Sequence, residues 1–195
     1  MSAGAVTPVL VHADESCLGN DRSKPSPGGN AALVEAPAGD SVARWDVYEC
    51  APQTTNNRMA LAGAIVTLEW IRRQWQHARV TYVSDSEYLI KGMNEWLPGW
   101  KARGWKKKNG PIENLELWRK LDQAAAAHTL TWRWVRGHAD HPKNEYANMR
   151  AIRAAERQER SNGLVPSDFD SWLEQQRARG KYQDYDPDPE VHERP

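Results

Sequence analysis

The 195-residue chain has very little phenylalanine or cysteine and no excess of charge of either sign. Its two cysteines, Cys17 and Cys50, form neither a disulfide framework nor a zinc pattern, and both are predicted to be free thiols. No apolar run approaches the roughly 18 residues needed to span a bilayer. The first residues also lack the basic start and apolar block of a secretory signal. These absences predict a cytoplasmic protein, expected to be a monomer, with no membrane partner.

The neutral total charge, 26 acidic against 26 basic residues, means that any nucleic-acid surface must be local. Residues 98–111 contain five basic residues and no acid, and ten tryptophans in the chain stand against one phenylalanine. Basic side chains attract phosphates, and aromatic faces pack against sugars or bases. The segment therefore predicts nucleic-acid contacts by Trp100, Lys101, Arg103, Trp105, Lys106 and Lys107. The alternative is a solvated charged helix whose tryptophans dock it to the core.

The hydrophobic pattern predicts strands at 6–13, 30–36 and 44–50, followed by a helix over 56–77. Strands at 80–84 and 129–135 alternate with helices at 87–95, 113–127 and 143–160, the first of these ending at Leu97-Pro98-Gly99. Strands followed by alternating helices and strands are typical of an α/β fold. Residues 1–160 are predicted to form one domain. Residues 161–195 are predicted to form an extension with one short helix at 167–179 and a disordered acidic tail.

Four segments, in order, resemble type 1 ribonucleases H, the bacterial ribonuclease HI-like family. They are DESCLGN at 14–20 with PGG at 27–29, TTNNRMA at 54–60, SDSEY at 84–88, and WVRGHADHP at 134–142 with Asn144-Glu145. The basic segment resembles the protrusion of bacterial members. The resemblance covers roughly residues 5 to 158. It implies a mixed five-stranded sheet, an antiparallel meander plus parallel strands, flanked by helices.

The same resemblance implies a two-metal site built from four acids, in which Mg²⁺ or Mn²⁺ activates water and stabilises the leaving oxygen. Asp14 and Asp85 match the two strand acids, and His138 matches a mobile family histidine. Ala60 stands where the family has a glutamate on the first helix, and Asn148 replaces the last aspartate. With two ligands lost, metal binding is expected to be weak and cleavage lost or severely reduced.

Two other acids are candidates to compensate for these losses. Glu15 directly follows Asp14, where the family has glycine, and is a third candidate metal ligand. Strand alternation argues against it, because neighbouring side chains point to opposite faces unless the strand bends or bulges. Glu145 lies three residues before Asn148 on one helix and is a weaker substitute. The preferred interpretation of both is an ordinary exposed acid.

Residues that resemble the family's hybrid-binding set are Cys17, Asn20, Asn56, Asn57 and Arg58. Amides donate and accept hydrogen bonds to base edges and 2′-hydroxyls, which distinguish RNA from DNA. The alternative for Asn56 is a simple helix cap.

Three functions remain open at this point. The first is a protein that binds RNA/DNA hybrid or related nucleic acid with little or no cleavage. The second is an active metal-dependent hybrid endoribonuclease with a rebuilt site. The third is a structural or protein-interaction subunit that reuses the fold through its C-terminal extension. A fold supports more than one function, so the site must decide between them.

Overall fold

A six-stranded mixed sheet forms the centre of the protein in a computed structural model, which describes residues 6–19, 25–137 and 141–188. The strand order is β5-β4-β1-β2-β3-β6. The strands are β1 (Thr7–Cys17), β2 (Ser26–Ala38), β3 (Ser41–Thr54), β4 (Ala78–Ser84), β5 (Thr129–Trp134) and β6 (Val165–Pro166).

The first three strands form the predicted antiparallel meander, and β4 and β5 add to it in parallel. This confirms the predicted mixed sheet of an antiparallel meander plus parallel strands. The predicted count of five strands was one too low, because β6 pairs with β3 at Trp45↔Pro166 and Asp46↔Val165. β6 has only two residues, one of them proline, so it carries no alternating pattern that would have revealed it.

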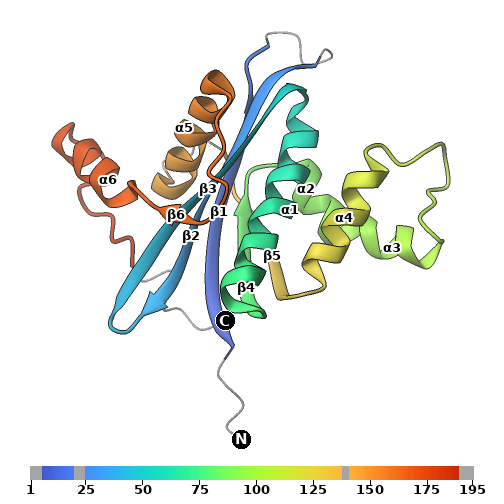
Figure 1. Ribbon diagram of the computed structural model, residues 1–195, viewed down its shortest axis with the longest axis horizontal. Coiled ribbons are helices and arrows are strands. Elements are labelled where there is room, and N and C mark those ends of the chain that lie inside the picture. The colour runs from blue at the N-terminus through green and yellow to red at the C-terminus, as the bar shows by residue number, and fades with distance from the viewer. Residues whose placement is uncertain (1–5, 20–24, 138–140, 189–195) are drawn as a thin grey trace, which may run out of the picture.

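Helices cover both faces of the sheet (Figure 1), with α1 and α4 on one side and α5 and α6 on the other. They are α1 (Asn56–Trp75), α2 (Glu87–Lys91), η1 (Gly92–Trp96), α3 (Leu97–Ala102), α4 (Leu115–Ala125), α5 (Pro142–Arg157) and α6 (Phe169–Ala178). Helix α1 begins after Thr55, whose side chain accepts a hydrogen bond from the Arg58 amide at 3.4 Å. Leu61, Ile65, Leu68 and Ile71 bury its apolar side in the main core. No helix in the described part of the chain has the length and apolarity needed to cross a membrane.

The prediction that the helix starting at Glu87 ends at Leu97-Pro98-Gly99 is wrong. The helical path runs on through the π-helical turn η1 into α3, where Pro98 lies in the first turn. Trp118 of α4, which is fully buried, packs so closely against Gly92 that any side chain there would overlap the indole.

The C-terminal extension packs on the sheet face that α5 covers. Phe169 and Leu173 of α6 are buried against Leu33 of β2 and Tyr146 of α5. Beside this apolar cluster, the hydroxyl of Tyr146 donates to an Asp46 carboxylate oxygen at 2.7 Å. The helix predicted over 167–179 is present.

Residues 183–188, part of the tail that the sequence predicts to be disordered, contact the domain in the structure. The Lys143 ammonium group donates to the carbonyl of Pro187 at 2.9 Å, and Arg44 pairs with Asp188 at 2.5 Å. Lys143 also pairs with Glu35 at 2.8 Å, and both of these side chains are fully buried. The tail thus supplies partners to buried charges, which its acidic, proline-bearing composition does not reveal. Residues 189–195 lie outside the described residues.

Candidate metal and nucleic-acid site

Asp14 and Asp85 meet because they follow the last residue pair of two parallel strands. The pairing of β1 with β4 runs from Thr7↔Ala78 to Ala13↔Ser84 and ends there. The carboxyl ends of parallel neighbours lie at the same edge of a sheet, so the acids that come next are brought together. The two predicted strand acids therefore share one site.

Glu15 is the third carboxylate of this site. Ligand oxygens of Asp14, Glu15 and Asp85 all lie within 4.8 Å of one another. Such a separation suits hard-oxygen ligands that share one or two divalent ions. The preferred interpretation of Glu15 as an ordinary exposed acid is therefore corrected.

Strand alternation does hold at Glu15, but it does not keep the side chain away from the site. Glu15 pairs with Asn30, whose amide touches Gly63 of α1, so Glu15 lies on the α1 face of the sheet. Asp14 lies on the opposite face, toward α5. Beyond Ala13 the side of β1 that faced β4 is no longer paired with it. Carboxylates from both faces of β1 can therefore converge at this open edge without a bulge.

Ala60 lies on the same face as Glu15, on the side of α1 that packs against the sheet. Its side chain is buried in the main core with Ala13. The acid missing from α1 is thus matched by an acid on β1 that points toward α1. Asn148 of α5 lines the same cleft and offers a neutral amide oxygen. Glu145 is not part of the carboxylate cluster found among the described residues.

Burial and mutual repulsion perturb these acids. Burial, followed by the nearby charge of Asp85, raises the pKa of Asp14 to about 8. Burial and the charges of Asp14 and Asp85 raise the pKa of Glu15 to about 8, opposed by a hydrogen bond from Ser86. Like charges at this separation are unfavourable, so the metal-free cluster retains protons near neutral pH. A divalent cation would remove that repulsion.

This perturbation predicts that the metal-free protein loses stability as pH rises from about 5 to about 8. A raised carboxyl pKa means that the folded state binds more protons than the unfolded state in this window, so the free energy of unfolding falls with pH. The loss is about 1.4 kcal/mol per pH unit for each retained proton. Denaturation in excess chelator measures it. The difference between the wild type and Glu15→Gln isolates the cluster from other titrating groups, and equal slopes would contradict the prediction.

The cleft around the carboxylates has a volume of about 700 Å³ and is lined mainly by polar groups. Of the predicted hybrid-binding residues, Cys17, Asn56 and Asn57 line it directly. Arg58 is turned toward α4, where its guanidinium donates to the side-chain oxygens of Asn114 and Glu116, at 2.9 Å each. The predicted residues Asn20 and His138 lie outside the described residues.

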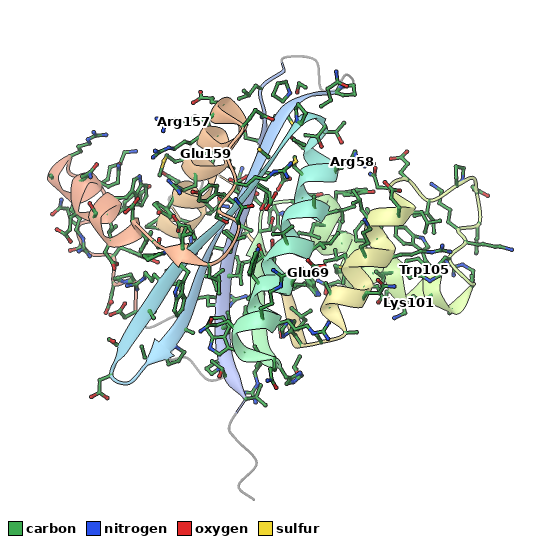
Figure 2. All side chains as sticks on the ribbon, in the orientation of Figure 1. Arg58, Glu69, Lys101, Trp105, Arg157 and Glu159 are labelled. Carbon is green, nitrogen blue, oxygen red and sulfur yellow. The ribbon has the colours of Figure 1, made fainter. Side chains whose placement is uncertain are left out.

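The basic segment lies beyond α4, well away from the sheet, where Figure 2 labels Lys101 and Trp105. Trp100 is partly buried against Trp118, with ring centroids 5.5 Å apart. The Trp105 ring lies under the guanidinium of Arg119 at 5.5 Å, and Lys101 pairs with Asp122 at 2.8 Å. The tryptophans thus dock the segment to the core.

Other cationic side chains of the segment remain available to a ligand. Arg103, Lys106 and Lys107 are exposed. Arg103 also donates to the backbone carbonyl of Lys106 at 3.2 Å. Both interpretations of the segment, docking by tryptophan and presentation of charge, are compatible with this arrangement.

Sequence reasoning missed residues that hold Asp85 in place. The indole N–H of Trp134 donates to the Asp85 carbonyl at 3.1 Å, and a side chain at Gly137 would overlap the Asp85 carboxylate. Ser86 was also missed, although it stands next to Asp85 in the sequence. No signal in the sequence marks Trp134 for this task, because it continues the alternation of β5 like any strand residue.

The family model for RNase H matches residues 7–156. The chain is 41% identical over 149 residues to a ribonuclease H from Cupriavidus necator, covering 76% of this chain and 95% of that protein. It is 44% identical over 141 residues to ribonuclease HI from Caulobacter vibrioides, covering 72% and 87%. The crystal structure of LC9-RNase H1, described as a type 1 RNase H with the type 2 active-site motif, superposes with a TM-score of 0.81 at 48% identity. That match covers 86% of this chain and 81% of LC9-RNase H1.

An α/β domain whose acids gather at the ends of parallel strands defines the general class, and these matches define the family. The chain belongs to the ribonuclease H family.

Proposed function

We propose that this chain is an active, divalent-metal-dependent endoribonuclease of RNA/DNA hybrids whose third carboxylate has moved from α1 to β1. The observation that carries the proposal is the convergence of Glu15 with Asp14 and Asp85 within 4.8 Å. Three carboxylates and an amide oxygen from Asn148 form a set of hard ligands suited to Mg²⁺ or Mn²⁺. The description of LC9-RNase H1 as a type 1 enzyme with a different active-site motif adds support, since that protein is 48% identical to this chain.

Bound divalent ions would activate the attacking water and stabilise charge on the leaving oxygen. The chain itself holds the ligands in place on rigid elements. Asp14 and Glu15 lie on a strand within the sheet, and Asp85 is fixed by the Trp134 hydrogen bond and the close approach of Gly137. Ligands held this way need little reorganisation during the reaction.

The hybrid would lie across the cleft and reach the basic segment. Asn56 and Asn57 at the start of α1 would contact base edges and 2′-hydroxyls, beside the carboxylates in the same cleft. The exposed lysines beyond α3 would bind backbone phosphate. Amides that read the RNA strand therefore stand next to the metal ligands that act on it.

The direct test is to incubate the unmodified protein with a labelled RNA/DNA hybrid and Mg²⁺ or Mn²⁺, and to measure cleavage and binding separately. Metal-dependent cleavage of the RNA strand is expected. Hybrid binding without turnover would contradict the proposal and favour the second candidate, a binding protein with a degenerate site. That candidate rests on the replacements at Ala60 and Asn148.

Moving the acid back to α1 should restore part of the activity. We expect Glu15→Gly to lose cleavage and the double variant Glu15→Gly/Ala60→Glu to recover it by about 10-fold or more over the single variant. The reason is that positions 15 and 60 lie on the same face of the sheet. Ala60→Glu alone should bring no gain, because it adds a fourth acid beside Asp14, Glu15 and Asp85 in a packed core. Single-turnover cleavage rates measure all three, and a double variant as inactive as Glu15→Gly would contradict the expectation.

Removing cations from the basic segment should flatten the salt dependence of hybrid binding. For Lys106→Ala/Lys107→Ala we expect the slope of log affinity against log salt to fall by about 1 to 2, since each lost phosphate contact removes about 0.9 from a duplex slope. The matched control is Arg179→Ala/Lys181→Ala, which removes two exposed cations after α6, on the other side of the sheet. An unchanged slope in the first variant would leave the segment without a role in binding.

A further inference from the structure

The side chain of Asn30 is hydrogen-bonded to the peptide group that joins Asp14 to Glu15. Asn30 lies in β2 opposite Glu15 and is only 2% exposed. Its amide nitrogen donates to the carbonyl oxygen of Asp14 at 2.9 Å. The N–H of the same peptide, from Glu15, donates to Oδ1 of Asp14 at 2.6 Å. Side chains therefore bond both polar groups of this single peptide.

The orientation of that peptide controls both carboxylates. Asp14 and Glu15 leave the strand on opposite faces, and a rotation of the peptide between them would swing the two side chains in different directions. Their convergence toward Asp85 requires one particular orientation. The hydrogen bond from the buried Asn30 amide, in the neighbouring strand, restricts the peptide to one orientation.

Helix α1 is shaped to admit this amide. A side chain at Gly63 would overlap the carboxamide of Asn30, so the absence of a Cβ lets the helix lie against it. Glycine in a helix interior is unfavourable, and the close approach gives a physical reason for it here. Ala60, one turn earlier on α1, is also small and buried. The α1 side of the site is thus built around Asn30 and Glu15 together.

We propose that Asn30 is a positioning residue for metal binding, which holds the Asp14–Glu15 peptide so that the two carboxylates converge, and that Gly63 makes room for it. The inference rests on the proposed function, because it concerns the same three-carboxylate site. Residues that orient metal ligands through hydrogen bonds commonly change metal affinity or activity by 10- to 100-fold.

The experiment compares Asn30→Leu, which keeps the volume and removes the donor, with Asn30→Ala. Mn²⁺ affinity is measured by calorimetry on the full chain, beside kcat and KM for a hybrid. Both variants are expected to bind Mn²⁺ about 10-fold more weakly or worse, and to lose kcat, while KM for the hybrid stays within about twofold. The control is Asn94→Ala, whose amide also donates to a strand carbonyl, that of Trp132 at 3.2 Å, but away from the carboxylates.

Gly63→Ala tests the same arrangement from the helix. Alone it should displace the Asn30 amide and reduce Mn²⁺ affinity about as much as Asn30→Ala. In the Asn30→Ala background the clashing group is gone, so Gly63→Ala should cost little more. Such non-additivity is the signature of two residues acting through one contact.

Wild-type metal affinity in Asn30→Leu would overturn the inference and reduce Asn30 to a packing residue, and additive effects of Gly63→Ala and Asn30→Ala would overturn it as well. If Asn30→Leu fails to fold in chelator, the Gly63→Ala series decides alone. Glu15→Gln measured in parallel separates the two proposals. If Glu15→Gln weakens Mn²⁺ binding and the Asn30 variants do not, only this inference is contradicted. If the wild-type protein binds no Mn²⁺, both proposals are contradicted.

Discussion

Replacing Glu15 with glutamine is expected to lower the rate of hybrid cleavage by about 100-fold or more, a loss typical of removing one electrostatic group from a preorganised site. Glutamine keeps the size and the carbonyl oxygen but removes the negative charge. Glu15 faces α1, where position 60 carries an alanine, so that helix position offers no carboxylate to replace its charge. Affinity for Mg²⁺ or Mn²⁺ should fall with the rate, and hybrid binding measured in chelator should not change.

The matched control is Glu69→Gln, which makes the same chemical change at an exposed position of α1, labelled in Figure 2. It should leave both rate and metal affinity as they are. If Glu15→Gln cleaves the hybrid at a rate within about threefold of the wild type, Asp14 and Asp85 suffice for cleavage. The proposal that Glu15 is the third metal ligand would then be wrong.

Ending the chain after Asn162 is expected to destabilise the domain by about 3–6 kcal/mol, the second large effect. Phe169 and Leu173 are both buried against Leu33 and Tyr146, and burial of one such side chain contributes about 1.5–3 kcal/mol. The truncation also removes Pro187 and Asp188, which bond the buried Lys143 and the nearly buried Arg44. The midpoint of chemical denaturation, followed by circular dichroism, measures the effect.

A chain ending after Asp188 is the control, because it removes only residues 189–195 and keeps every tail contact described above. The stability lost between the chain ending at Asp188 and the chain ending at Asn162 measures the contribution of residues 163–188. If the chain ending at Asn162 is equally stable, the extension contributes nothing to folding. Its apolar residues would then be free for a partner, as the third functional hypothesis requires.

Much of the architecture could be read from the chain because local patterns are strong in it. The period of Leu61, Ile65, Leu68 and Ile71 predicts α1 to within a few residues, and the prediction of a meander followed by parallel strands is confirmed. The helical run through Pro98 could not be predicted, because a proline after a helical pattern normally marks the end of the helix.

The candidate site divides in the same way. Placing Asp14 and Asp85 together needs only the knowledge that both follow the stretch where their strands pair in parallel, which the family resemblance and the strand pattern supply. The proposed positioning role of Asn30 could not be predicted from the sequence. It depends on where its side chain in β2 lies, which is against both the Asp14 carbonyl of β1 and Gly63 of α1.

By itself, the sequence determined the family, the order of the elements and the loss of the α1 glutamate at Ala60, because each is a property of residue identity along the chain. That Glu15 lies beside Asp14 and Asp85 in one carboxylate cluster was decided only by the tertiary structure. The alternation of side chains along a strand places Glu15 on one face of β1. The pairing of β1 with β4 ends at Ala13↔Ser84, and beyond it the edge of β1 is open, so that the Glu15 side chain can reach Asp85.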